Sequence, residues 1–294
     1  MARLFTAYVI VDWSAASKAG TGADLIQIGV LKRDVRFRLA FESYAPASRA
    51  EAEKRIGLIL DDLKKKGERA LLGFNFPLGF PRGLAAALKL TGEPWTAVWD
   101  YLDKMVKDKA DNTNNRFGVA AEINRRTTGG PFPFWGCPPR DTLTTLQPKR
   151  VREHGPDDLP EFRSADLAVK GSSIWKLYYA GAVGGHAILG IPMLRRLRHA
   201  RAVKVWPFDT GWKALSEADL EGAEALAVEV QLSLNPTPPL PGEAKELALV
   251  RGMAERIAKL DETGKLAAAF APPKGVADAE AEAVAREEGW VLNL

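Results

Sequence analysis

The sequence contains few of the residues that build disulfides and soft-metal clusters. Its 294 residues include one cysteine, Cys137, and only three histidines. A single cysteine excludes an intramolecular disulfide and a cysteine-based metal cluster, and it suits a reducing compartment. The N-terminus lacks a basic segment followed by a long apolar stretch, and no window reaches the roughly 18 apolar residues of a membrane span. We therefore expect a cytoplasmic protein that makes no membrane contact.

Charge of either sign is not in large excess, since 41 basic residues stand against 37 acidic ones and the net charge is +4. A mild excess of this kind permits nucleic-acid binding without indicating it, because nucleic-acid-binding proteins gather their cations on one face. The densest basic stretch, MLRRLRHARAVK at 193–204, is interpreted first as a solvated helix end. The alternative is a phosphate-binding patch.

The hydrophobic pattern predicts an α/β protein with a mixed sheet. Strands are expected at 5–12, 24–31 and 35–42, joined as an antiparallel meander. In the third strand Val35, Phe37, Leu39 and Phe41 alternate with polar residues. A helix at 48–66 capped by Ser48, a buried parallel strand at 70–74 and a helix from about 84 follow. Later strands are expected at 202–206, 226–232 and, as an edge strand, 289–294, with helices at 243–260, 265–270 and 276–288.

Residues 92–200 differ in composition from the rest of the chain. They are rich in charge and tryptophan and contain the loop GGPFPFWGCPP at 129–139. Long loops inside compact proteins are usually functional or disordered, and this aromatic content argues against disorder. We interpret this region as a mainly helical insertion that packs on a core formed by 1–91 and 201–294.

Three acids are candidates for chemistry. Asp12 ends the first strand, Glu229 lies within a late strand, and Asp278 opens the last helix. If these segments converge, their carboxylates form a cluster that requires a cation, typically Mg²⁺ or Mn²⁺. Such metals activate water at a phosphodiester.

Each acid also has a purely structural interpretation. Asp12 is a good turn residue, because its carboxylate can accept backbone N–H groups. Glu229 points away from Val228 and Val230, and that face is as easily solvent as a site. Asp278 is an ordinary first-turn acid of a helix.

Several long motifs resemble one known family. The chain is similar to the predicted ribonuclease H-like proteins grouped as domain of unknown function 429, and within them to a bacterial subgroup. The segments that carry the resemblance are IVDWSA (10–15), GFNFPLGFP (73–81), NNRFGVAAEINRR (114–126), PFWGCPP (133–139), SIWKLYYAGAVGGHAILGIP (173–192), VWPFDTG (205–211) and EEGWVL (287–292).

The resemblance implies an RNase H-like fold with a metal site at the end of the first strand. Asp12 matches the acid of that strand, Glu229 matches a later strand acid, and Asp278 is the best match for the C-terminal acid. We expect Asp12 and Glu229 to hold the cation, with Asp278 or Glu282 assisting. Asn75 stands where the family tends to have a second aspartate. Because asparagine removes one negative charge, the match implies weak binding of a single Mg²⁺ or Mn²⁺, or a degenerate site.

Other residues are candidates for contacts to substrate. Arg116 and Arg125 lie on an expected helix, and each either forms a structural ion pair or binds phosphate. Lys176 precedes the glycine cluster at 181–185, and Ser14 lies in the loop after the first strand. None of these matches a known phosphate loop.

Three functions remain open at the level of sequence. The first is an RNase H-like, metal-dependent phosphodiester hydrolase of nuclease type, or its degenerate descendant. The second is a non-catalytic protein of the same fold that binds a nucleotide, a nucleic acid or a protein partner. The third is an enzyme that acts on a small phosphorylated metabolite or cofactor precursor.

Overall fold

A single mixed sheet organises the chain. The computed structural model describes residues 3–22, 25–33, 36 and 38–292. Six strands lie in the order β3-β2-β1-β4-β6-β5, with β2 antiparallel to its two neighbours and the other pairs parallel. The strands are β1 (Ala7–Asp12), β2 (Gln27–Arg33), β3 (Leu39–Tyr44), β4 (Ala70–Phe74), β5 (Val203–Val205) and β6 (Ala225–Glu229). The predicted α/β class, the mixed sheet and the opening meander are confirmed.

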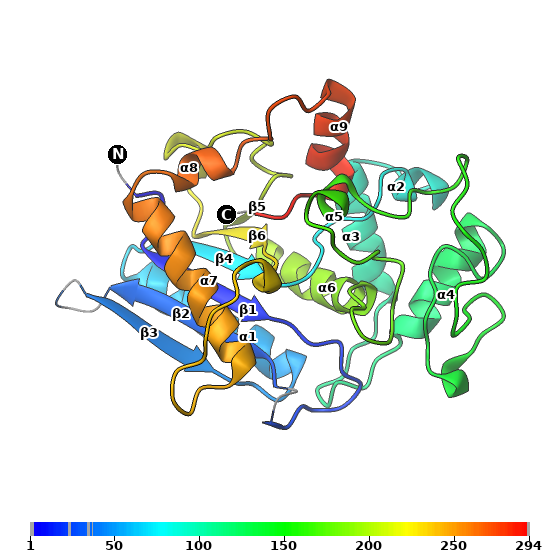
Figure 1. Ribbon diagram of the computed structural model, residues 1–294, viewed down its shortest axis with the longest axis horizontal. Helices are drawn as coiled ribbons and strands as arrows, with labels where there is room; N and C mark the ends of the chain where they lie inside the picture. Colours follow the sequence, from blue (N-terminus) through cyan, green and yellow to red (C-terminus); the bar gives the residue numbers. More distant parts are fainter. Residues whose placement is uncertain (1–2, 23–24, 34–35, 37, 293–294) are drawn as a thin grey trace.

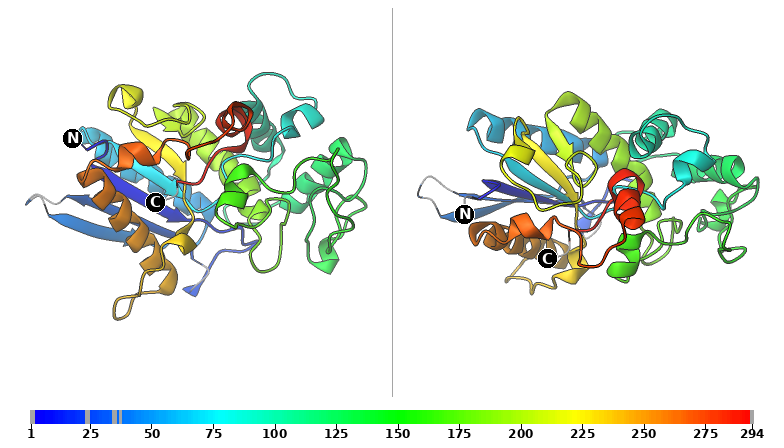
Figure 2. Two further views of the ribbon diagram at one scale, coloured as in Figure 1. Left: turned by 45° about the horizontal axis from the view of Figure 1, so that its top comes forward. Right: turned by 90° about the horizontal axis from the view of Figure 1, so that it is seen from above.

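Helices cover both faces of the sheet. Figure 1 and the view from above in Figure 2 place α7 on one face and α1 and α6 on the other. The α-helices are α1 (Arg49–Lys65), α2 (Leu84–Ala87), α3 (Pro94–Met105), α4 (Arg116–Thr127), α5 (Ser164–Ala168), α6 (Gly184–Ala200), α7 (Lys245–Glu262), α8 (Leu266–Ala269) and α9 (Asp278–Ala283), which continues as a π-turn to Glu288. None of the helices in the described ranges is long and apolar enough to cross a membrane.

Two hydrophobic clusters form because successive side chains of a strand point to opposite faces. Val9 and Val11 of β1 join the cluster beneath α1 and α6. Tyr8 and Ile10 join the cluster beneath α7. Ser48 accepts a hydrogen bond from the backbone N–H of Glu51 and so caps α1, as predicted.

A buried aspartate fixes α7 against the first strand. The carboxylate of Asp261 accepts hydrogen bonds of 2.9 Å from the N–H groups of Leu4 and Phe5 and from the hydroxyl of Tyr8. Burial and the charge of Asp261 raise the pKa of Tyr8 above its ordinary range. Because the last turns of α7 are held at the start of β1, the first turn of α7 lies toward the end of β1, where Asp12 is (Figure 1).

The region expected to be an insertion contributes α3, α4, α5 and α6, with long ordered loops between them. In Figure 1, α4 and α5 lie beyond the carboxyl ends of β1 and β4. Phe134 and Trp175 from these loops belong to the same hydrophobic cluster as β1. The segment therefore packs on the sheet, and the division into core and insertion stays a prediction.

Several predicted strand limits were wrong. The third strand begins at Leu39; Val35 and Phe37 lie outside the described residues, and Leu39 is exposed because β3 is at the edge of the sheet. Glu229 is the last residue of β6, whereas the sequence placed it mid-strand. Of the edge strand expected at 289–294, the described residues 289–292 form one isolated bridge, between Val291 and Glu229, and residues 293–294 lie outside the described part of the chain.

Candidate functional site

The ends of neighbouring parallel strands bring Asp12 and Asn75 together. Val11 of β1 pairs with Phe74 of β4, so the residues that follow lie side by side. The Nδ2 of Asn75 donates a hydrogen bond of 2.9 Å to Oδ1 of Asp12. The amide oxygen of Asn75 accepts one of 3.4 Å from the N–H of Leu232, just beyond β6. One side chain thus links the ends of three strands.

Asp12 is a partly buried carboxylate with an elevated pKa. Burial is the main cause, the hydrogen bond from Asn75 opposes it, and the negative charge of Glu246 adds to it. Within the residues that the structure describes, no Lys, Arg or His forms an ion pair with Asp12. Glu246 lies in the first turn of α7 and was not among the acids predicted from the sequence to take part in chemistry. Its helical position is ordinary, so only the packing of α7 on β1 reveals it.

Glu229 is held by an arginine that the sequence analysis also missed. Arg163 donates from Nη2 to Oε1 at 2.7 Å and from Nη1 to Oε2 at 2.8 Å. The N–H of Leu78 donates to the same Oε2 at 3.0 Å. Glu229 is 4% exposed, so this carboxylate is buried, and it accepts two hydrogen bonds from Arg163 and one from Leu78. Its cationic partner is Arg163, which it shares with Asp166.

Arg163 is the centre of a larger buried network. It also donates to Asp166 from Nη2 at 2.7 Å and to the carbonyl oxygen of Glu288 from Nη1 at 3.0 Å. Burial by itself lowers the pKa of Arg163, but the charges of Asp166 and Glu229 and their hydrogen bonds hold it well above its ordinary value. The guanidinium is therefore a fixed cation.

The third expected carboxylate is not part of this arrangement. Asp278 is the exposed first residue of α9, and Glu282 of the same helix pairs with Arg286 at 3.1 Å. Over the described ranges, no three His, Cys, Asp or Glu side chains are grouped to hold a metal ion. The residues present do not fit two bridged cations, because Glu229 belongs to Arg163 and Asn75 directs a donor at Asp12.

Two cavities open near the carboxyl ends of the strands. The smaller, of about 220 Å³, is lined by the Glu229 and Arg163 network and by polar residues of the neighbouring loops. The larger has a volume of about 820 Å³ and follows directly after β1. Its lining residues include Ser14, Ser17, Lys18, Thr21, Arg116, Phe117, Arg140, Asp141, Tyr178, Tyr179 and His186.

Arg116 is the most unusual charge in the larger cavity. It is 5% exposed, and its Nη1 donates at 2.9 Å to two neutral oxygens, Oγ of Ser17 and Oδ1 of Asn114. Its Nε is buried without a partner. In the part of the chain described here, no carboxylate lies within ion-pair distance of it. Burial and the nearby charge of Arg49 lower its pKa to about 10, while the charges of Asp141, Tyr178 and Asp108 oppose this shift, so Arg116 remains a cation at neutral pH.

The loop after β1 is held rigidly in this cavity. Arg49 donates from Nη1 to the carbonyl oxygens of Ser14 and Ala16 at 3.1 and 2.8 Å. The same guanidinium pairs with Asp108, through two contacts of 2.6 Å. Asn112 donates to the carbonyl oxygen of Lys18 at 3.0 Å. The loop is therefore clamped between α1 and the segment before α4.

His186 lies in the wall of the same cavity at the start of α6. Burial and the positive charges of Arg116 and Arg49 lower its pKa to about 4, while a hydrogen bond with the backbone of Ala182 opposes this shift. His186 is therefore neutral at physiological pH and leaves Arg116 as the buried cation.

The remaining candidate residues have structural contacts. Ser14 lines the larger cavity, and its Oγ accepts from the N–H of Ala16 at 3.2 Å. Arg125 is exposed and pairs with Glu122 of the same helix at 2.6 Å. Lys176 donates to the carbonyl oxygen of Ala180 at 2.5 Å and so braces the loop before α6.

The basic stretch around the end of α6 is neutralised. Arg195 pairs with Asp100 and Asp103, and Arg196 pairs with Glu53 and Asp103. The later cations of the stretch bind Asp209, Asp61 and a backbone carbonyl oxygen. A phosphate-binding patch at this place is not supported.

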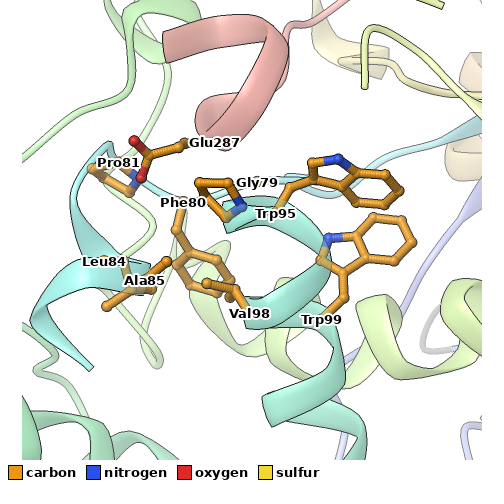
Figure 3. A pocket seen from close by; sticks show the side chains of 10 residues that line it. Gly79, Phe80, Pro81, Leu84, Ala85, Trp95, Val98, Trp99 and Glu287 are labelled. Atoms are coloured by element: carbon orange, nitrogen blue, oxygen red, sulfur yellow. The ribbon is translucent and has the colours of Figure 1, made fainter. Parts of the chain in front are cut away.

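A third pocket is apolar and very small. It lies between α3 and the loop after β4, with Phe80, Trp95 and Trp99 in its wall and Glu287 at its edge (Figure 3). Its volume of about 10 Å³ accommodates roughly one water molecule. The loop passes so close to the C-terminal segment that a Cβ on Gly79 would lie 2.3 Å from the carbonyl oxygen of Glu287. This pocket is a packing defect too small for a ligand.

Comparison of the chain with family models, with curated proteins and with solved structures gave no match.

The Arg163 network predicts a strong energetic coupling. We expect Arg163→Met to lower the free energy of unfolding by about 3–5 kcal/mol, because Glu229 and Asp166 are left buried without their cation. Adding Glu229→Gln to that variant should restore part of the loss. Equilibrium urea denaturation of the two single variants and the double variant measures the coupling. Arg125→Met removes an exposed pair and should cost at most about 1 kcal/mol; additive losses at 163 and 229 would contradict the network.

The elevated pKa of Asp12 predicts that its charge destabilises the fold. The folded protein takes up this proton at a higher pH than the unfolded chain does, whose ordinary pKa is 3.8. Stability is therefore lost as the pH rises through the folded-state pKa. We expect Asp12→Asn to raise the Tm at pH 7 and the gain to disappear as the pH approaches 4. The pKa of exposed Asp62 is lowered by Lys66, so Asp62→Asn should give no gain at any pH.

Proposed function

We propose that this protein is an RNase H-like protein that binds a small phosphate-containing ligand beside the end of β1, without a two-metal nuclease centre. The observation that carries this proposal is Arg116, a buried cation that has neutral partners only and lines a cavity of about 820 Å³. A buried charge without a counter-ion is costly, and a phosphate supplies the missing anion.

The fold and the carboxylates support the same proposal. The strand order and directions agree with what the resemblance implies for an RNase H-like sheet. In open α/β sheets, ligands bind outside the carboxyl ends of the parallel strands, where this cavity lies. The two-point ion pair of Glu229 with Arg163 argues against its sharing metal ions with Asp12.

A second candidate function is hydrolysis of a phosphodiester with one weakly bound Mg²⁺ or Mn²⁺. It is favoured by Asp12, whose carboxylate receives one amide donor and whose pKa is raised further by the nearby charge of Glu246. A hard cation between two such carboxylates would relieve their repulsion. Asp12 and Glu246 would hold the ion, which would supply Lewis-acid chemistry, and Asn75 would turn its amide oxygen toward it.

The binding proposal is tested with inorganic phosphate and pyrophosphate by isothermal titration calorimetry. We expect binding in the presence of EDTA, with an affinity that falls as the NaCl concentration rises. Arg116→Lys should weaken binding about tenfold or more, because it keeps the charge and loses the planar donor set. Arg125→Lys, on the same helix, should leave it unchanged. Binding only to long oligonucleotides, or no binding in EDTA, would contradict the proposal.

The second candidate predicts a response to metal that depends on Asp12. In a thermal-shift titration, Mn²⁺ should raise the Tm of the wild-type protein and have no effect on Asp12→Asn. Glu246→Gln should weaken the response, and Asp278→Asn should retain it, since Asp278 is exposed on α9. The Mn²⁺-dependent rate of cleavage of a bis(p-nitrophenyl) phosphate probe should change in the same way: retained in Asp278→Asn, reduced in Glu246→Gln and lost in Asp12→Asn. An equal shift in wild type and Asp12→Asn rejects this function.

A further inference from the structure

The larger cavity pairs its buried cation with an aromatic wall. Tyr178 and Tyr179 line the cavity, 39% and 49% exposed, with ring centroids 4.8 Å apart. Phe117 packs edge-on against Tyr178, at 6.3 Å between centroids. The guanidinium of Arg116 lies over the ring of Phe117 at 4.3 Å. A continuous path thus runs from the cation, across Phe117, to two half-exposed phenol rings.

The aromatic wall is built into the fold. The N–H of Leu177 donates to the carbonyl oxygen of Trp135 at 3.0 Å, and the N–H of Gly184 donates to that of Lys176 at 3.0 Å. Tyr179 has a φ of 72°, a left-handed conformation that is rare for a bulky residue. Strained backbone of this kind persists where the surroundings fix it, and it concentrates at ligand sites. The two tyrosines are therefore presented at a defined place.

The charges of the cavity suit a group that bears more than one negative charge. Lys18, Arg116 and Arg140 line it together with one acid, Asp141, which lies 3.7 Å from Arg140. Ser14, Ser17 and Thr21 add hydroxyl groups along the same loop. Several cations and hydroxyls that line one cavity match the oxygens of a phosphate monoester better than a single carboxylate.

We propose that the larger cavity binds a mononucleotide, with the phosphate on Arg116 and the planar base against Tyr178 and Tyr179. This inference rests on the proposed binding of a phosphate-containing ligand and names its chemical class. A volume of about 820 Å³ lies in the range of small-molecule sites. Base stacking on aromatic rings tolerates any base, because every base presents a π-face. A long nucleic acid fits less well, since the basic stretch on α6 is already paired with acids.

The test separates the base from the phosphate. Calorimetry on the 294-residue protein compares the four nucleoside 5′-monophosphates with the matching nucleosides, ribose 5-phosphate and inorganic phosphate. We expect at least one monophosphate to bind about tenfold or more tightly than its nucleoside and than ribose 5-phosphate. Tyr178→Ala should weaken that nucleotide about tenfold and leave ribose 5-phosphate unchanged. The exposed control Leu167→Ala, outside the cavity, should affect neither.

The outcomes distinguish the two proposals. If ribose 5-phosphate binds as tightly as every nucleotide and Tyr178→Ala changes nothing, the mononucleotide assignment is overturned and phosphate binding stands. If no phosphate-containing probe binds, both proposals fail. Because Tyr178 is half exposed, its replacement is not expected to unfold the protein. A circular dichroism melt of each variant checks that the proteins whose affinities are compared are folded.

Discussion

The ion pair between Arg163 and Glu229 is the interaction on which the carboxyl end of β6 and the segments packed against it depend. It joins the last residue of β6 to the N-cap residue of α5, and the same guanidinium reaches the backbone at Glu288. The C-terminal segment then lies beside β6, where the N–H of Leu292 donates to the carbonyl oxygen of Glu229 at 2.8 Å. Three distant parts of the chain therefore meet at one buried cation. Removal of the guanidinium would leave two buried carboxylates without their cation, so these residues are constrained together.

The charges at this end of the sheet are of two kinds. Glu229 and Asp166 share the cation of Arg163, whereas Asp12 and Arg116 form no ion pair among the described residues. Asp12 accepts a hydrogen bond from the amide of Asn75 and lies near the charge of Glu246, while Nε of Arg116 is buried without a partner. Unpaired buried charges lower stability and are enriched at functional sites, and this is why the proposed ligand is placed at Arg116.

The sequence was sufficient to predict the strands and helices whose hydrophobic pattern is local. It was insufficient to predict which side chains from distant segments contact one another. The buried runs at β1 and β4 and the apolar stripe of α1 are determined by neighbours two to four residues away, and these predictions hold. The roles of Arg163 and Glu246 depend on how α5 and α7 pack, and neither carries a local signal. Glu229 illustrates the intermediate case: alternation placed it opposite its valines, but only the pairing of β6 with β4 and the position of Arg163 show that its face is buried.

Asn75 shows how the ends of these strands can be held together without a metal ion. An aspartate at this position would place a second negative charge beside Asp12, and the strand ends would then require a cation to remain close. Asparagine has nearly the same shape but donates one hydrogen bond to Asp12 and accepts one from Leu232. These two bonds hold the carboxyl ends of β1, β4 and β6 together without an ion. An amide also lacks the charge that makes a carboxylate a strong ligand for a hard cation. Asparagine at position 75 therefore suits the sheet as it is packed here and does not favour a two-metal centre.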